Sequence, residues 1–394
     1  MLSIDQARAV VLDAVRPRSA EAVPVDAALG RVLARDVVAA GDVPPFAGSA
    51  MDGFAVRSAD SGAGLASGLP VVGESRAGAP AQQGLEAGEA IRISTGAMLP
   101  AGADGVIPLE LVSEGDGRVR LHEPVEPGRN VRGAGEDLRA GATVLRAGST
   151  LGPAELGVAV AAGLGIVTCA PRPRVAIIAT GDELVAPGAP LRPGQIHNSN
   201  AVTLGALARR SGADVVRTAA VTDTPAATRA AFEQALGEAD VVIASGGVSV
   251  GPHDHVKPAL AALGVIEAFW RVALRPGKPT WFGTREDRLV LGLPGNPVSA
   301  MVTFVLFARP ALAALQGADP GIHRIRGVLA EARERHPNRD ECVRVRLDED
   351  RRAHLTGPQG SHVLSSMLGA DGLAVIPRGT GTLRAGAAVD VELL

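Results

Sequence analysis

The stretch "DVVIASGGVSVGPHDHVKP", residues 240–258, decides the fold class. It begins as an apolar run, breaks at Gly246 and Gly247, and then brings an acid, Asp254, and an ammonium, Lys257, into a helix-like segment. A buried strand followed by a glycine-rich turn and a helix is the repeating unit of a parallel sheet. The stretch therefore predicts a strand that delivers a polar loop to the carboxyl edge of such a sheet.

The same alternation of strand and helix patterns runs through residues 171–320. The expected strands are "RVAIIAT", "DVVRTAAV", "DVVIAS" and "RLVLGLP", and the expected helices cover residues 199–212, 224–237, 254–264 and 296–317. This rhythm predicts a doubly wound, mostly parallel sheet domain. Such sheets bind ligands in the crevice beyond the carboxyl ends of their strands.

The chain of 394 residues is longer than one hydrophobic core usually organises, so we expect a multidomain α/β protein. Glycine, proline and short strand patterns mark a β-rich domain at residues 41–140. Residues 1–40 together with 141–170 are expected to form a small helical and linker domain. Residues 171–320 form the α/β domain, and residues 321–394 a C-terminal β domain.

Composition argues against several classes of protein. The formal net charge is −3, without the basic excess of a nucleic-acid or membrane binder. Two isolated cysteines, Cys169 and Cys342, favour a reducing compartment and disfavour a cysteine-rich zinc site. The first residues carry acids early and do not resemble a signal peptide. We therefore expect a cytoplasmic protein that binds neither nucleic acid nor membrane.

Carboxylates follow three of the expected strands. Glu183 follows the first strand, Asp223 the second and Asp254 the third. Carboxylate oxygens are ligands that Mg²⁺ prefers, usually together with bridging phosphates. Purely structural alternatives stay open: Asp254 could be a helix cap, Asp223 a turn residue, and Glu183 could form a solvated loop pair with Asp182.

Glycines and cations accompany these acids. Glycine lets backbone N–H groups approach an anion closely, and a cationic pair suits a phosphate or other oxyanion. Only two residues of the chain are lysines, and both lie beside glycine-rich segments. The candidate substrate-binding residues of these loops are Gly246, Gly247, Ser249, Gly251, Lys257, Pro294, Gly295, Asn296 and Ser299, and the candidate cations near an oxyanion are Arg275 and Lys278.

Seven motifs in order carry a resemblance that covers nearly the whole chain. They are "SAMDGFA", "STGAMLPAGAD", "RGAGED", "TGDEL", "SGGVSVG..D..K", "PGKP" and "GLPGNPVSA". Individually they read as turns and loops. Together they resemble the molybdopterin molybdenumtransferase family, which comprises the MoeA proteins and the matching C-terminal region of gephyrin.

The resemblance implies a reaction. Family members insert molybdenum from molybdate into adenylylated molybdopterin and release AMP, with a divalent cation such as Mg²⁺. It also implies an elongated homodimer with a shared active site, and leaves open contacts with other proteins of molybdenum-cofactor biosynthesis. By motif, Glu183, Asp223 and Asp254 are the metal-holding catalytic acids, Arg275 and Lys278 the catalytic cations, and Asp52 and Thr95 the catalytic contribution of the partner's β-rich domain. Arg344, Ser361 and Ser365 of the terminal domain resemble substrate-binding positions.

Two departures from the family pattern stand out. Family members commonly have an acid directly after "SVG", where this chain has Pro252 followed by His253. Proline fixes φ and removes a backbone donor, so the loop shape is expected to differ. Family members often have lysine at the position of Arg275, which keeps the charge but changes its geometry.

Other functions remain open from the sequence. The sheet domain alone resembles molybdopterin adenylyltransferase, although the small adenylyltransferases lack a β-rich domain with "SAMDGFA". A non-catalytic pterin-binding scaffold is the alternative from a different class, and the presence of acids and cations weighs against it. Molybdate and tungstate, nearly equal in size and charge, are not distinguished by these residues.

Overall fold

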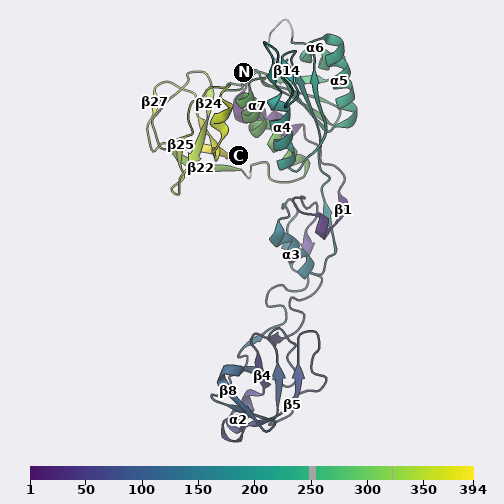
Figure 1. Cartoon of the computed structure of the whole chain (residues 1–394), viewed down its shortest axis with the longest axis vertical. Coiled ribbons are helices and arrows are strands. Elements are labelled where there is room, and N and C mark those ends of the chain that lie inside the picture. Colours follow the sequence, from purple (N-terminus) through teal and green to yellow (C-terminus); the bar gives the residue numbers. More distant parts are fainter. Residues whose placement is uncertain (248–253, 322) are drawn as a thin grey trace.

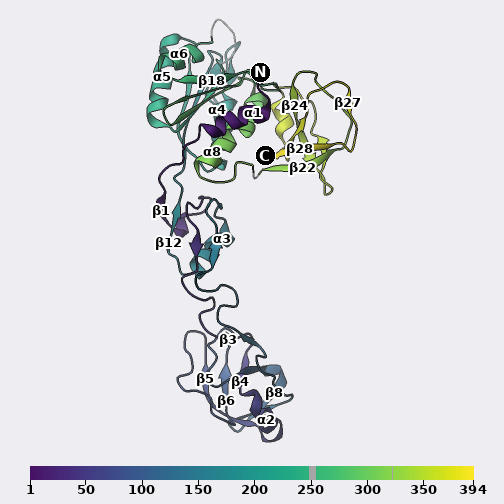
Figure 2. The same cartoon turned by 180° about the vertical axis from the view of Figure 1, so that it is seen from behind.

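The computed structural model describes residues 1–247, 254–321 and 323–394. The chain forms a long, bent molecule (Figure 1), and the reverse view shows the same outline (Figure 2). A sheet domain and a C-terminal domain together make the head. A narrow stem leads from the head to a distal β domain, far from both termini. This is the multidomain α/β architecture that the sequence predicts; Ser249, Gly251, Pro252 and His253 lie outside the described residues.

The sheet domain contains a six-stranded sheet in the order β16-β13-β17-β21-β20-β18. Neighbours β16, β13, β17 and β21 are parallel, whereas β20 runs antiparallel to β21 and to β18. In chain order the strands are β13 (Arg174–Thr180), β16 (Asp214–Val221), β17 (Val241–Ser245), β18 (Ile266–Trp270), β20 (Trp281–Arg285) and β21 (Arg288–Leu293), and a short ribbon joins β14 (Leu184–Val185) to β15 (Ile196–His197).

Helices cover both faces of this sheet because alternate side chains of a strand point to opposite faces. On β13, Val175 and Ile177 join one buried cluster with α1 (Ile4–Asp13), α4 (Ser199–Arg210), α7 (Pro297–Thr303) and α8 (Arg309–Leu315). Ala176 and Ile178 join a second cluster with α5 (Pro225–Glu238) and α6 (Val256–Ala262).

The segment 297–315 is the central helix of the head. A π-helical turn, Phe304–Ala308, joins α7 to α8, and the side chains of this turn are completely buried. By length and composition alone the segment could cross a membrane, but 78% of its most apolar window is buried inside the protein. It therefore behaves as the core helix of the head.

Helix α1 lies in the head rather than in the stem. Ser3 caps it reciprocally with Gln6, and Ile4, Ala7 and Val11 enter the sheet-domain core. The sequence grouped residues 1–40 with 141–170, but α1 lies in the head (Figure 2), because its apolar stripe matches the core there.

The stem is a small unit held together by two antiparallel strand pairs and one helix. Strand β1 (Glu21–Pro24) pairs with β12 (Ile166–Cys169), and β2 (Val37–Val38) pairs with β11 (Thr143–Leu145). Helix α3 (Pro153–Ala161) packs on the stem core with Leu33, Leu151 and Val167. Two chain segments thus connect the stem to the head, and two more connect it to the distal domain.

The distal domain has a six-stranded sheet in the order β7-β4-β6-β5-β9-β8. Its elements are β3 (Gly48–Ser49), β4 (Gly53–Val56), α2 (Ser61–Ser67), β5 (Leu69–Ser75), β6 (Ala90–Ile93), β7 (Gly105–Pro108), β8 (Val112–Gly115), β9 (Arg118–Leu121) and β10 (Val131–Arg132). Buried Phe54, Val56, Ile107 and Val119 form its own core.

The C-terminal domain is a small barrel. Strands β24, β25, β22, β28 and β26 pair in succession, and β26 pairs again with β24 to close the ring. Its own strands are β22 (Arg324–Leu329), β23 (Arg333–Glu334), β24 (Asp340–Leu347), β25 (Arg352–Leu355), β26 (Gly372–Ile376), β27 (Thr382–Leu383) and β28 (Ala388–Leu393), and β19 (Leu274–Arg275) adds to its edge. Strand β19 comes from the sheet domain and pairs with β24, so the two halves of the head share a hydrogen-bonded edge.

Candidate functional site

Four parallel strands end at one edge of the head sheet. Beyond β16 lies Asp223, beyond β13 lies Glu183, and beyond β17 lie Gly246 and Gly247. The turn that starts α7 follows β21. The polar loops that the sequence places after four strands therefore do follow four adjacent strand ends, the position at which such sheets bind ligands.

The two glycines after β17 have backbones that only glycine adopts easily. Gly246 has φ +91° and Gly247 φ +66°. A Cβ on Gly247 would stand 2.5 Å from Cγ2 of Val256 and 2.8 Å from Oγ1 of Thr180. The turn is thus packed tightly against both neighbours, and its N–H groups stay close to the sheet edge.

Asn200 joins the ends of two neighbouring strands. Its side-chain amide donates to Oγ of Ser245, at 2.8 Å, and to the carbonyl of Gly295, at 2.7 Å. Asn200 Oδ1 and Thr180 Oγ1 are buried and lack a hydrogen-bond partner among the described residues. Buried polar atoms usually have partners, so these two mark a place where a ligand, a water or the neighbouring loop would complete the contacts.

The three candidate metal-holding acids lie at the ends of adjacent strands. Glu183 is exposed, whereas Asp223 and Asp254 are half-buried. The backbone N–H of Asp223 donates to Oδ1 of Asp182 at 3.0 Å, so Asp182 supports the loop. Within residues 1–247, 254–321 and 323–394, no group of three or more His, Cys, Asp or Glu side chains is placed to hold a metal by itself.

Lys257 makes a contact that the sequence does not reveal. Its ammonium lies 3.4 Å from the ring centroid of Trp270, and the Arg271 guanidinium lies 4.0 Å from the same ring. The sequence placed Lys257 beside Asp254 on one helical face, but α6 begins only at Val256. Lys257 is therefore held by a cation–π contact on β18.

A cavity of about 440 Å³ lies between the sheet domain and the C-terminal barrel. It contains six of the candidate residues: Arg275, Lys278, Pro294, Asn296, Ser299 and Ser361. The side chains of Arg275 and Lys278 are exposed, so both cations reach the solvent. Nε of Arg275 lies 3.8 Å from the buried Glu341 carboxylate, which Arg333 contacts at 3.0 Å.

Ser361 fastens the C-terminal domain to the start of α7. Asn296 donates from Nδ2 to Oγ of Ser361 at 3.1 Å, and the carbonyl of Ser361 accepts from the N–H of Val298 at 3.1 Å. The resemblance placed Ser361 at the substrate. The structure lets it both line the cavity and join its two walls.

Arg344 does not line this cavity. Its side chain is completely buried; Nε donates to Ser366, and one terminal nitrogen donates to the carbonyls of Pro358 and Gly360. Burial lowers its pKa. Arg344 thus positions the loop that carries Ser361 from behind, contrary to the expected direct contact, and Ser365, though exposed, lies outside the cavity lining.

Asp52 and Thr95 lie together in the distal domain. The backbone N–H of Thr95 donates to Oδ1 of Asp52 at 2.8 Å, and both residues are exposed. The whole stem separates this pair from the cavity in the head (Figure 1). The structure therefore places the candidate residues in two distant groups.

Comparison with known proteins follows this division into domains. Residues 2–163 match the MoeA N-terminal region (domain I and II), residues 176–314 a probable molybdopterin binding domain, and residues 326–394 the MoeA C-terminal region (domain IV). A protein of Haemophilus influenzae named molybdopterin molybdenumtransferase is 37% identical, with 100% of this chain and 98% of the relative covered. The chain belongs to the MoeA family.

Other MoeA relatives agree over similar lengths. Molybdopterin molybdenumtransferase 2 of Mycobacterium tuberculosis is 38% identical, with 99% of each chain covered. The crystal structure of a MoeA protein from Pyrococcus horikoshii superposes with a TM-score of 0.84 at 33% identity, covering 100% of this chain and 99% of that one. The family and the multidomain fold expected from the seven motifs are thus confirmed.

The MoeA cavity of this chain also contains residues that sequence reasoning missed. Arg339, Gln359, Gly360 and His362 line it alongside Lys278. Gln359 accepts the N–H of Arg344 at 2.8 Å, which fixes the loop. No strand-end pattern marks these residues, because they come from the terminal barrel. The segment "GPQGSH", which contains the candidate Ser361, is the sequence signal that could have indicated Gln359, Gly360 and His362.

Proposed function

We propose that this chain is a molybdopterin molybdenumtransferase that inserts molybdenum from molybdate into adenylylated molybdopterin and releases AMP. Membership of the MoeA family makes the chain a transferase of molybdenum-cofactor biosynthesis. The observation that carries the finer proposal is the cavity at the end of β21, where two exposed cations meet the polar side chains of Asn296, Ser299 and Ser361. Such a site suits a small tetrahedral oxyanion.

Molybdate binds in this cavity through Lys278 and Arg275. Lysine presents a mobile point charge. Arg275 keeps unused N–H donors, because within the described residues its one ion pair, with Glu341, is long at 3.8 Å. The polar side chains opposite orient the oxygens of the anion. The two cations also offset charge that develops on the phosphate, so catalysis here is largely positioning and electrostatic stabilisation.

The pyrophosphate of the pterin substrate lies along the strand ends, where the turn at Gly246 and Gly247 brings backbone donors close. Mg²⁺ is usually bound by one or two carboxylates together with substrate phosphates rather than by a cage made only of protein. Glu183, Asp223 and Asp254, on adjacent strand ends without a closed cluster, fit a cation of that kind. The ion would supply neutralisation of phosphate charge, and the acids hold it in place.

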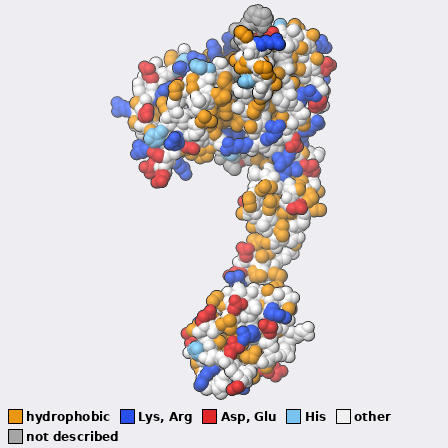
Figure 3. Space-filling view, viewed as in Figure 1, with side chains coloured by type: hydrophobic (Ala, Val, Ile, Leu, Met, Phe, Trp, Pro, Cys, Tyr) orange, Lys and Arg blue, Asp and Glu red, His pale blue; other side chains and the backbone are white. Residues whose placement is uncertain are grey.

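The active site is shared between two copies of the chain in a homodimer. Asp52 and Thr95 flank β4 and β6 of the distal domain, whereas Lys278 lies before β20 of the head. The stem separates these two domains, so one chain does not bring the two groups together (Figure 1). Large apolar side chains are exposed on the stem: Leu29 at 56%, Val160 at 60% and Ile166 at 61%. Hydrophobic side chains cover much of the stem in the space-filling view (Figure 3). An exposed apolar surface of this kind favours burial against a second copy of the chain.

A turnover assay tests the reaction. The purified chain is incubated with adenylylated molybdopterin, molybdate and Mg²⁺, and AMP is measured. We expect AMP release that depends on all three, and a large loss in Asp254→Ala. ATP consumption with unmodified molybdopterin would instead establish an adenylyltransferase, and binding of pterin without AMP release would establish a scaffold.

Mixed dimers test the shared site. An inactive Asp52→Ala chain and an inactive Lys278→Ala chain are combined. We expect the mixture to regain activity, because one of the two sites in a mixed dimer has both groups intact. A mixture as inactive as its parents would exclude a shared site.

A further inference from the structure

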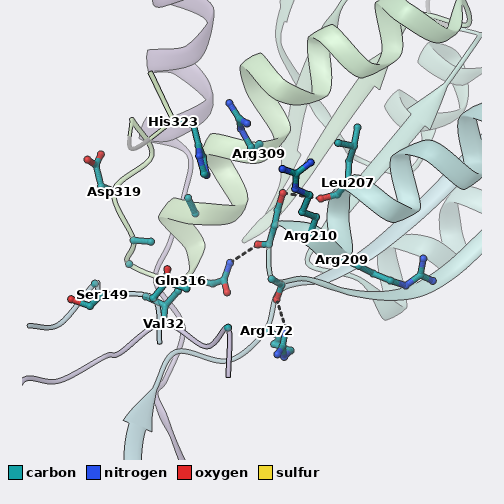
Figure 4. Close-up of a pocket in the computed structure, with 18 of the residues that line it drawn as sticks. Val32, Ser149, Arg172, Leu207, Arg209, Arg210, Arg309, Gln316, Asp319 and His323 are labelled. Atoms are coloured by element: carbon teal, nitrogen blue, oxygen red, sulfur yellow. Dashed lines mark hydrogen bonds between the residues drawn. The ribbon is translucent and has the colours of Figure 1, made fainter. Parts of the chain in front are cut away.

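A second, larger cavity lies where the head meets the stem (Figure 4). Its volume is about 870 Å³. Helix α4 begins beside the proposed active site, where Asn200 contacts Gly295, and ends at this cavity with Arg210. Helix α4, twelve residues long, thus runs from the loops of the proposed active site to this cavity, whose lining residues Arg172 and Gly212 lie just before the starts of β13 and β16.

Three domains build the walls of this cavity. The stem contributes Val32 and Ser149, α8 and the residues after it contribute Ala313 and Gln316, and the C-terminal domain contributes His323. The walls are largely apolar, with charged groups projecting among them. Cavities of this size that combine apolar walls with a few convergent polar groups are typical of small-ligand sites.

The charged groups are mostly cationic. Arg172, Arg209, Arg210 and Arg309 line the cavity, against Asp319 and the main-chain carboxylate of the last residue, Leu394. Arg172 donates to the backbone carbonyls of Leu29 and Gly212, and Arg210 to the backbone oxygen of Leu394 at 2.8 Å.

Among the described parts of the chain, Arg172 and Arg210 form no ion pair with a side-chain carboxylate. A guanidinium has five N–H donors, so each of these arginines keeps several unused. Arg309 does have an acidic partner, Glu392, at 3.4 Å, but that carboxylate also serves Arg8 and Arg324.

The pKa of His323 responds to these positive charges. Its pKa is lowered by burial and then by the charges of Arg309 and Arg210. Burial disfavours the charged imidazolium in any case, whereas the arginine charges that add to the shift favour an anion beside His323.

We propose that this cavity binds a small phosphate-bearing anion, which Arg172 and Arg210 hold. Arginine donors match phosphate oxygens in pairs, and the volume accommodates a nucleoside monophosphate. Because the walls belong to the stem and to both halves of the head, the bound anion ties the stem to the head. If the active site is shared as proposed above, this tie also sets where the distal domain reaches; binding of the anion itself does not depend on that proposal.

Arg209 provides a matched control beside Arg210. Its guanidinium folds back over its own helix, so that Nη1 would lie 3.3 Å from a Cβ placed on Gly205. Figure 4 shows it extended away from Arg210, Arg309 and His323. Both residues occupy the last turn of α4, so replacing either removes the same favourable charge from the helix end.

The test is a calorimetric titration of the full chain carrying Lys278→Ala, which weakens anion binding at the other cavity. Inorganic phosphate and AMP are the two probes, and they distinguish recognition of the phosphate alone from recognition of a nucleotide. AMP is also the product of the proposed reaction, so AMP binding that Arg172→Gln and Arg210→Gln leave unchanged belongs to the active site. For the second cavity we expect a site with affinity at least about tenfold weaker after Arg210→Gln or Arg172→Gln and nearly unchanged after Arg209→Gln. Thermal unfolding of each variant confirms that it is folded, and Arg172→Gln carries the test if Arg210→Gln does not fold.

Two results would overturn the proposal. One is the absence of binding of either probe at millimolar concentration to the Lys278→Ala chain. The other is equal weakening by Arg209→Gln and Arg210→Gln, which would show that the anion responds to general surface charge.

Discussion

Replacing Glu392 with glutamine should destabilise the head much more than replacing Asp390 with asparagine, two residues earlier on the same strand. The Glu392 side chain is 5% exposed and contacts Arg8 at 2.6 Å, Arg324 at 3.0 Å and Arg309 at 3.4 Å. Arg8 lies on α1, Arg324 on β22 and Arg309 on α8. The one carboxylate of Glu392 therefore joins the barrel to the sheet domain. Asp390 is 37% exposed, and in the described part of the chain its one ion-pair partner is the exposed Arg326, at 3.2 Å.

The magnitude follows from burial. Removing one partner of a buried ion pair leaves an uncompensated charge and costs about 3–5 kcal/mol. Glutamine keeps an acceptor and Arg324 is 34% exposed, so we expect the lower end, about 3 kcal/mol. The exposed pair of Asp390 contributes at most about 1 kcal/mol.

Tryptophan fluorescence during urea unfolding measures this difference in the free energy of unfolding of the head. The chain has two tryptophans, Trp270 and Trp281, and both lie in the head sheet. The transition therefore reports on the head and not on the distal domain. Losses below about 1 kcal/mol in both variants would refute the reasoning, because Glu392 would then not join the two halves of the head.

The remaining predictions concern single positions. Gly247→Ala should cost at least about 1–2 kcal/mol in urea unfolding because its φ of +66° disfavours a Cβ and the added atom meets Val256 at 2.5 Å. Gly295→Ala, whose Cβ would meet its nearest neighbour at an ordinary 3.7 Å, should unfold like the wild type; equal losses would contradict the packing argument. Hydrogen bonds from the hydroxyl and N–H of Ser58 lower the pKa of Asp104 below its ordinary value of 3.8. The resulting stabilisation of the distal domain is complete above pH 3.8 and is lost as pH falls through the lowered pKa. Asp104→Asn should therefore make the stability of the distal domain depend less on pH in this acid range. Circular dichroism of the unfolding transition of that domain, recorded as a function of pH, measures the difference.

Much of the head follows from the sequence because its signals are local. Strand patterns such as "RVAIIAT" and the glycines after Ser245 fix where a parallel strand ends, and the connection rule for such sheets brings those ends together. The same reasoning located Lys278 and Asn296, since both flank glycine-rich turns.

Other parts depend on contacts between distant segments and do not show in the sequence. Arg344 sits in a strand pattern that says nothing of its burial, yet its guanidinium holds a loop 14 to 16 residues away. Likewise, helix α1 joins the head, and Lys257 lies over Trp270, because of packing that a one-dimensional pattern does not record. For this reason the sequence did not show that Arg344 lies behind the cavity wall rather than in it.

The most direct test of the central claim is molybdate-dependent AMP release by the wild type and by Lys278→Ala. With adenylylated molybdopterin and Mg²⁺, the wild type should release AMP when molybdate is added and little without it. Removing the ammonium should slow release by about 100-fold or more, the usual effect of losing one preorganised charge at a reacting anion. Unchanged AMP release without molybdate, or in Lys278→Ala, would contradict the proposal that this cavity delivers the oxyanion.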